Sequence, residues 1–201
     1  MGFKSYNIDT VFSRKIKMYE YNIIPNDVRT LINYTIANNL KPNPVLRLGR
    51  KNIQPKGETL WYLSWDAIIQ LRSALVDNDL VKSIELVYGL NKKQFTQLEI
   101  FNAYAAYLWI VIEFKNMIET EIEQLSFELD EDEKNAGTED LQDFGYAVAL
   151  DGLAGGDILK YDQYLRLPYT KVFRKLCMDK TRYEINKNMQ KNASRNIRTN
   201  S

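Results

Sequence analysis

The chain has 201 residues, of which 45% are hydrophobic and 26% charged, a composition typical of a globular protein. Its 27 Lys and Arg nearly balance its 26 Asp and Glu, so a formal net charge of +1 gives no global field that would recruit nucleic acid or a membrane. It has no histidine and one cysteine, Cys177, which excludes Ser-His and Cys-His nucleophile pairs, imidazole metal ligands, an internal disulfide and a cysteine-based zinc site. We therefore expect no catalytic residue, no metal and no cofactor.

No segment has the pattern of a secretory signal or a membrane span. The N-terminus lacks a charged stretch followed by an apolar one. The longest apolar run, from Ala103 to Ile112, is about half of the roughly 20 residues that a spanning helix needs. We expect this run to lie in a buried helix and predict no membrane partner.

Residues 1–24 lack helical periodicity. Apolar and polar residues alternate from 15 to 18, with the apolar ones at even positions, and again from 19 to 23, with the apolar ones at odd positions. This alternation predicts an extended arm or a short strand. Asn26 or Asp27 then caps a helix. Pro42 and Pro44 end it, because proline disfavours a helical residue before itself.

Residues 41–59 form the first irregular stretch, with three prolines and two glycines. Within it, residues 45–48 could pair as a strand. Residues 41–57 hold five basic residues and no acid, a local charge of +5. A basic loop of this length is unusual inside a domain and is often functional.

From Ser64 onward the pattern predicts helices. Ser64 is the expected cap of the first, and residues 77–79 end it and cap a second, which Gly89 terminates. Thr96 and Glu99 have the spacing of a capping box, which predicts the start of the longest helix there. The predicted buried stripe of that helix comprises Leu98, Phe101, Ala105, Leu108, Ile112, Ile118, Ile122 and Leu125.

Shorter helices are predicted after residue 137. Thr138 or Asp140 opens one of them, and its expected buried residues are Phe144, Ala147, Val148 and Leu150. Gly155-Gly156-Asp157 ends this helix and caps the next turn, and Pro168 suits the first turn of a last helix. After Asn186 the chain is polar and aperiodic, which predicts an extended tail that orders only against a partner.

The predicted fold is mainly α. A helical bundle spans residues 25–185, with the basic loop 41–59 inserted, and is flanked by an extended arm at 1–24 and an extended basic tail at 186–201.

Charge is segregated along the chain. Residues 119–143 contain eleven acids and one lysine, a local charge of −10, and residues 171–201 contain nine basic residues and two acids, a charge of +7. The acidic run lacks the spacing of a calcium-binding loop, and a carboxylate metal site in a bundle usually needs a Glu-x-x-His partner. We interpret the run as a solvated turn between helices.

Eight basic residues are the candidate binding residues. They could bind phosphates, or an acidic protein surface such as the acidic run of a neighbouring copy, or they could be ordinary solvated surface. They are Arg47, Arg50, Lys51, Lys56, Lys187, Lys191, Arg195 and Arg198.

One segment of the chain resembles known proteins. It comprises residues 150–161, Leu-Asp-Gly-Leu-Ala-Gly-Gly-Asp-Ile-Leu-Lys-Tyr, followed by Leu167-Pro168-Tyr169 and the helix through Leu176. This segment resembles small helical proteins from the structural gene modules of tailed bacteriophages, particularly the crAss-like phages. The resemblance covers residues 140–190, about a quarter of the chain.

The resemblance implies a virion protein without catalytic residues. One implied role is a subunit of a closed ring at the phage head–tail junction, a connector or adaptor in the neck or tail. Its partners would be copies of itself, the portal and other tail or neck proteins, and DNA passing through the channel. The other implied role is a tail assembly chaperone. Outside the phage setting, the alternative is a helical nucleic-acid-associated protein.

Overall fold

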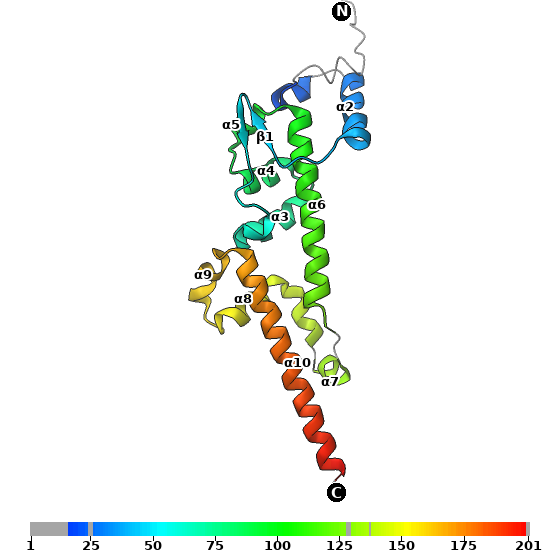
Figure 1. Cartoon of the computed structure of the whole chain (residues 1–201), viewed down its shortest axis with the longest axis vertical. Coiled ribbons are helices and arrows are strands. Elements are labelled where there is room, and N and C mark those ends of the chain that lie inside the picture. Colours follow the sequence, from blue (N-terminus) through cyan, green and yellow to red (C-terminus); the bar gives the residue numbers. More distant parts are fainter. Residues whose placement is uncertain (1–15, 24–25, 128–129, 137, 200–201) are drawn as a thin grey trace, which may run out of the picture. The chain divides into compact units, whose positions relative to one another are not determined.

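The computed structural model describes residues 16–23, 26–127, 130–136 and 138–199. Helices dominate these residues, and their strands form one two-stranded sheet (Figure 1). The predicted mainly α fold is confirmed. The chain divides into two compact units, each described here by itself. The first unit comprises Met1–Leu63 and Ala67–Asn116, and the second comprises Ser64–Asp66 and Met117–Ser201.

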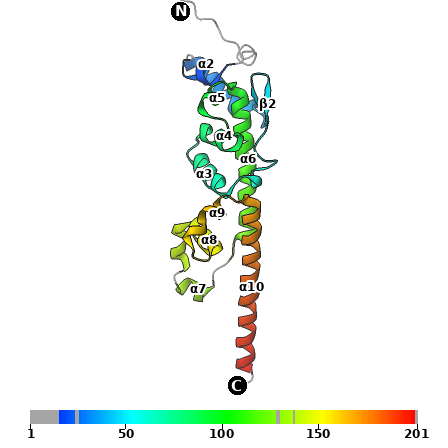
Figure 2. The same cartoon turned by 90° about the vertical axis from the view of Figure 1, so that its left-hand side faces the viewer.

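Helices of the first unit pack along the N-terminal part of its longest helix. Figures 1 and 2 both show α3, α4 and α5 beside α6. Ile68, Leu71, Ile84, Val87 and Ile110 are at most 1% exposed and lie in this core. The elements are η1 (Met18–Ile23), α2 (Asn26–Asn39), β1 (Leu46–Leu48), β2 (Lys51–Ile53), η2 (Leu60–Tyr62), α3 (Trp65–Val76), α4 (Leu80–Tyr88), α5 (Lys92–Thr96) and α6 (Ile100–Leu125), which continues into the second unit.

The start of the described chain is only partly extended. Lys17 forms an isolated antiparallel bridge with Glu99, and the Met18 amide donates to the Leu98 carbonyl at 2.9 Å. The prediction of a strand is wrong for residues 18–23, which form the 3₁₀-helix η1. The Glu20 carboxylate accepts a hydrogen bond from the Lys17 amide at 2.7 Å, and this bond favours a turn over an extended strand. The rest of the predicted arm, residues 1–15, lies outside the described residues.

The irregular stretch at 41–59 contains a β-hairpin. Leu46 pairs with Ile53 and Leu48 with Lys51, so the predicted strand exists and a two-residue turn follows it. Gly49 lies in that turn at φ +61°, a left-handed conformation that glycine adopts without strain. Because strand side chains alternate, Leu46 and Leu48 share one face with Ile53. That face is turned inward, and Leu46 is fully buried.

Helix α6 anchors the first strand and the segment that leads into it, at Asn43, Val45 and Arg47. The Asn102 side chain accepts a hydrogen bond from the Arg47 amide at 2.5 Å and donates to the Val45 carbonyl at 3.0 Å. The Asn43 amide donates to the Ala105 carbonyl at 3.0 Å. One asparagine thus satisfies two backbone groups of a segment that lies more than fifty residues earlier in the chain.

Several predicted helix ends are confirmed. The Asp79 side chain accepts a hydrogen bond from the Lys82 amide and caps α4, which Gly89 ends in the left-handed conformation. The predicted capping box at Thr96 and Glu99 is wrong. Thr96 is the last residue of α5, and its hydroxyl donates to the Lys93 carbonyl, while the capping box belongs to Asn91 and Gln94 at the start of α5.

The predicted stripe of α6 is wrong at two of its positions. Ile112 is 40% exposed and Ile122 is 61% exposed. Apolar residues occur on every side of this helix between 103 and 112, so several stripes fit its sequence equally well. The buried side includes small residues, which allow neighbouring backbones to approach closely. Its buried residues are Ile100, Ala103, Ala105, Ala106, Ile110, Phe114 and Met117.

The second unit is built from short helices and one long one. Gly155 ends α8 in the left-handed conformation and Asp157 caps η4, as predicted. Leu150 is buried as predicted, but Phe144 is 64% exposed and Val148 is 38% exposed, so their predicted burial is wrong. The elements are α7 (Glu131–Asn135), η3 (Thr138–Phe144), α8 (Tyr146–Ala154), η4 (Ile158–Lys160), α9 (Tyr161–Leu165) and α10 (Tyr169–Thr199).

The C-terminal segment differs from the predicted extended tail. Helix α10 continues without interruption to Thr199, so residues 186–199 are helical. No proline or glycine interrupts the sequence between 169 and 199, and its Lys, Arg, Gln and Met residues have good helix propensity. Ion pairs from Lys187 and Lys191 to Asp130 also tie this part of the helix to the start of α7.

The Asn102 anchor gives a test of the first unit. We expect Asn102→Ala to lower the free energy of unfolding by about 1–3 kcal/mol, because it removes two hydrogen bonds that each contribute about 0.5–1.5 kcal/mol. Urea denaturation followed by tryptophan fluorescence measures the change. Asn52→Ala, on the exposed face of β2, is the control and should change stability by less than about 0.5 kcal/mol. Equal effects of the two substitutions would contradict the anchoring role.

Candidate interaction surfaces

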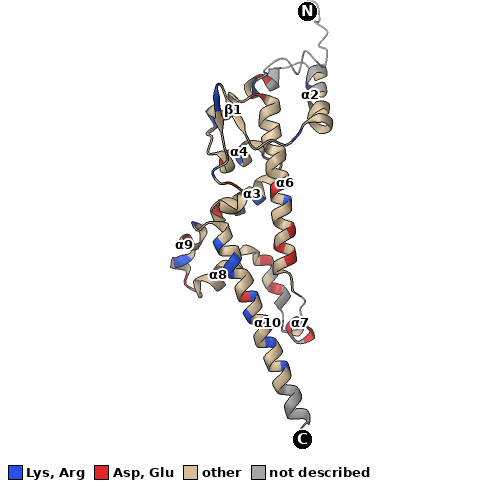
Figure 3. Cartoon of the chain, viewed as in Figure 1, with Lys and Arg blue, Asp and Glu red and all other residues tan. Residues whose placement is uncertain are grey.

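The β-hairpin presents the first group of candidate basic residues. Arg47, Arg50, Lys51 and Lys56 are all exposed. Figure 3 shows basic residues along this hairpin. Arg47 lies on the strand face opposite Leu46 and Leu48, directed away from the core. Within the described part of the chain, no acidic side chain pairs with any of these four cations. The prediction of a basic surface at residues 41–57 therefore corresponds to an exposed, uncompensated charge.

The hairpin is held firmly at its base. The Tyr88 hydroxyl donates to the Pro44 carbonyl at 2.8 Å, and the Lys56 amide donates to the Val87 carbonyl at 2.9 Å. Burial raises the pKa of the Tyr88 phenol well above its ordinary value, so the hydroxyl stays protonated as a donor. The Lys56 side chain passes over Gly89, where an added Cβ would meet the Lys56 Cε at 2.8 Å. The backbone at the base of the hairpin, which carries the cations, is thus held in place.

Helix α10 carries the second group of candidate basic residues. The first two of them, Lys187 and Lys191, form ion pairs within the chain. The Lys187 Nζ lies 2.8 Å from the Asp130 Oδ2 and 2.6 Å from the Glu133 Oε2, and the Lys191 Nζ lies 3.6 Å from the Asp130 Oδ2. Lys187 is therefore mainly an intrachain partner rather than a free binding residue. The side chains of Arg195 and Arg198 lie outside the described residues.

Asp130 and Glu133 form a capping box at the start of α7 that sequence analysis missed. The Asp130 amide donates to the Glu133 carboxylate at 2.8 Å, and the Glu133 amide donates to the Asp130 carboxylate at 3.1 Å. The sequence signal for this capping box is an acidic residue, Asp130, followed three positions later by a glutamate, Glu133. The hydrogen bonds from Lys187 lower the pKa of the Asp130 carboxyl to about 2, and they also lower the pKa of Glu133. The acidic run is thus partly neutralised by α10.

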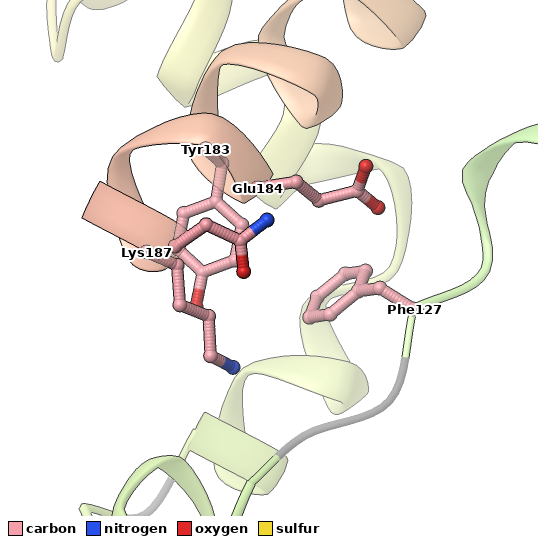
Figure 4. Close-up of a pocket in the computed structure, with 5 residues that line it drawn as sticks. Phe127, Tyr183, Glu184 and Lys187 are labelled. Carbon is pink, nitrogen blue, oxygen red and sulfur yellow. The ribbon is translucent and has the colours of Figure 1, made fainter. Parts of the chain in front are cut away.

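A small pocket lies beside this contact (Figure 4). Its volume is about 230 Å³, and Phe127, Tyr183, Glu184, Lys187 and Asn188 line it. The Phe127 and Tyr183 rings are 6.1 Å apart between centroids, and the Lys187 Nζ is 5.7 Å from the Tyr183 centroid. The Glu184 carboxylate pairs with the Lys180 ammonium at 3.6 Å. Both charged residues of the pocket have partners within the chain, so the pocket offers no free charge to a ligand.

The second unit has many exposed apolar side chains. Among the described residues, six buried hydrophobic residues belong to this unit: Trp65, Met117, Leu150, Ala154, Tyr169 and Val172. Twice as many of its large apolar residues are exposed. These are Ile122, Phe127, Leu141, Phe144, Tyr146, Val148, Ile158, Leu159, Met178, Tyr183, Ile185 and Met189.

The first unit shows the opposite balance. It holds the other nineteen buried hydrophobic residues found in the described part of the chain, against seven exposed large ones. The extreme cases in the second unit are adjacent in η4, where Ile158 is 71% exposed and Leu159 is 83% exposed. Water contact with apolar side chains is unfavourable, so these exposed residues are candidates for burial against a partner.

Two further features were searched for in the described residues. No group of three or more Cys, Asp and Glu side chains there is arranged to hold a metal ion. None of the helices there combines the length and the apolar character needed to cross a membrane.

The chain was also compared with known proteins. No protein-family model matches it, and neither a curated protein nor a solved structure shows significant similarity to it. The exposed charged and apolar surfaces of the chain are therefore the features that bear on its function.

The contact between α7 and α10 gives a testable titration. We expect the Asp130 carboxyl to titrate at about 2, and Lys187→Met to return its pKa toward the ordinary value of 3.8, because the hydrogen bond from Lys187 is the largest cause of the shift. Since the pKa is lowered in the folded chain, the contact stabilises the fold above pH 4 and is lost as pH falls through about 2. Carboxyl-detected NMR measures both values.

Lys191→Met is the control for this titration. Lys191 acts on Asp130 through charge alone, the smallest of the causes, so its removal should move the pKa less than removal of Lys187 does. An Asp130 pKa that is the same in the wild type and in Lys187→Met would show that the two side chains do not pair in solution.

Proposed function

We propose that this protein is a structural, non-catalytic subunit of a protein assembly, and that its second unit makes the assembly contacts. The observation that carries the proposal is the excess of exposed over buried large apolar residues in that unit. Removing a leucine- or phenylalanine-sized side chain from water is worth about 1.5–3 kcal/mol, so a partner that covers several of them gains considerable affinity.

The composition supports a structural role over a catalytic one. With no histidine in the sequence, proton transfer near neutral pH would depend on a carboxylate or lysine whose pKa is strongly shifted toward neutrality. The pKa values of the Asp130 and Glu133 carboxyls are lowered instead, away from neutral pH. These two carboxylates act as ion-pair partners and helix caps.

The more specific proposal is a subunit of an oligomeric ring at the head–tail junction of a tailed phage, located in the virion. It is supported by the resemblance of residues 150–161 and 167–169 to phage structural proteins. These residues span the end of α8, η4 and the start of α9 and α10, and they include the exposed Ile158 and Leu159. A ring repeats one contact between unlike surfaces, and an uncovered apolar surface on every copy suits such a contact.

Quantitative mass spectrometry of virions purified from the host that expresses the gene tests the virion role. A fixed copy number in every particle is the expected result. Abundance in infected cells together with absence from mature virions would contradict the ring and would support the tail assembly chaperone instead.

Assembly itself can be tested on the purified full chain. We expect mass photometry to find a discrete multiple of the 23.5 kDa chain. We further expect Ile158→Ser combined with Leu159→Ser to raise the dissociation constant at least tenfold, because burying each of these side chains is worth about 1.5–3 kcal/mol and a tenfold change is about 1.4 kcal/mol. Val76→Ser is the matched control, since Val76 is 77% exposed and lies in the first unit. An unchanged assembly in the η4 variant would show that η4 lies outside the contact.

A second candidate function, nucleic-acid binding, is favoured by the three cations of the hairpin and by Lys56 after it, which have no acidic partner among the described residues. Gly57 lies against Tyr62, an exposed aromatic side chain in the segment that follows the hairpin, and such rings can stack on bases. Fluorescence anisotropy with a short DNA duplex at several salt concentrations tests this function. Binding through several phosphates weakens steeply as salt rises, and no binding at low salt would exclude it.

A further inference from the structure

We propose that the basic hairpin of one copy binds the free acidic residues of a second copy. The basic hairpin is defined here by Arg47, Arg50 and Lys51, and the free acidic residues are Glu131, Asp140 and Asp143 of α7 and η3. This inference extends the proposed function, because it requires that the chain assembles with itself.

The hairpin is a charged surface without a partner of its own. Its three cations are exposed, and the described residues provide no acidic partner for them. The sequence holds no acid between residues 41 and 57, so local rearrangement of the hairpin cannot neutralise them. The hydrogen bonds from Asn102 and Tyr88 fix the position of the hairpin's base. The backbone that carries the cations therefore loses little conformational entropy on binding.

The acidic run divides into engaged and free members. Asp130 and Glu133 are paired with Lys187 of α10. Glu131, Asp140 and Asp143 are exposed, and in the described ranges no cation pairs with them. Helices α7 and η3 contact each other, which brings the three free acids into neighbouring elements. The lysines of α10 therefore leave a negative surface uncompensated.

Exposed apolar residues accompany the free acids. In η3, Leu141 is 49% exposed and Phe144 is 64% exposed, next to Asp140 and Asp143 in sequence. Isolated ion pairs at a surface contribute little affinity, whereas charges at the rim of an apolar contact steer the encounter and fix its orientation. Apolar contact would supply the affinity, and the charge pairs would determine which surfaces meet.

A second copy fits the hairpin better than nucleic acid does. The chain has a net charge of only +1, and the same chain carries a local charge of −10 at residues 119–143, which repels a polyanion. Each copy brings both a free positive surface and a free negative one. Contact between two unlike surfaces is heterologous, and its repetition closes into a ring or continues as a filament.

Charge reversal on each side tests the contact. The first variant combines Arg47→Glu, Arg50→Glu and Lys51→Glu, and the second combines Glu131→Lys, Asp140→Lys and Asp143→Lys. A control with the same change of charge as the first, Lys92→Glu with Lys93→Glu and Lys171→Glu, alters exposed lysines at the starts of α5 and α10. Circular dichroism checks that every variant folds, and mass photometry measures assembly of the full chains.

We expect each reversed variant alone to assemble at least tenfold more weakly than the wild type, and the control to assemble normally. Mixing the two reversed variants should restore assembly, because each then meets an opposite surface on the other. Restoration in the mixture requires contact between copies, which a contact within one chain would not produce.

The outcomes separate this inference from the proposed function. A wild-type chain that stays monomeric would overturn both. A wild type that assembles while the hairpin variant also assembles normally would overturn the inference alone, as would a mixture of the reversed variants that fails to assemble. Loss of DNA binding by the hairpin variant with unchanged assembly would assign the hairpin to nucleic acid and also overturn the inference.

Discussion

Polar anchoring to residues 98–105, which comprise the start of α6 and the two residues before it, is the constraint on which the irregular part of the first unit depends. The Leu98 carbonyl accepts from the Met18 amide at the start of η1, the Asn102 side chain bonds to the β-hairpin, and the Ala105 carbonyl accepts from the segment before the hairpin. These hydrogen bonds act together with apolar contacts, because Leu46 is fully buried and Met18 packs against a core cluster. A helix that offers polar groups at its N-terminal end and small buried residues beside them provides both the hydrogen bonds and the close approach that these segments need.

The two units differ in how many of their apolar residues they bury. In the first unit more large apolar residues are buried than exposed, whereas in the second more are exposed than buried. Helix α10 illustrates the difference, because Tyr169 and Val172 near its start are buried, while Ile185 and Met189 are exposed. A partner that covered these exposed residues would stabilise the unit, which is the physical basis of the proposed assembly role.

Sequence patterns predicted features that depend on neighbouring residues. The caps at Asp79 and Asp157 and the helix ends at Gly89 and Gly155 follow from local chemistry, and all four are confirmed. The buried side of α6 and the helical state of residues 186–199 depend on contacts with distant segments, and these predictions differed from the structure. The pairing of Lys187 with Asp130 joins residues 57 positions apart, which no spacing rule detects. The basic hairpin was found because its charge is a local property, although its strand pairing was only partly predicted.

The contact of Lys187 with Asp130 and Glu133 has a consequence for how the molecule responds to acidity. The pKa of both carboxyls is lowered and that of Lys187 is raised, so the three charges persist from mildly acidic to strongly alkaline solution. With no histidine in the sequence, none of its side chains has an ordinary pKa between 5 and 8. The pattern of surface charge is therefore constant over the physiological pH range. Ionic strength, which screens charges without titrating them, is the solution variable to which contacts between copies of this protein would respond.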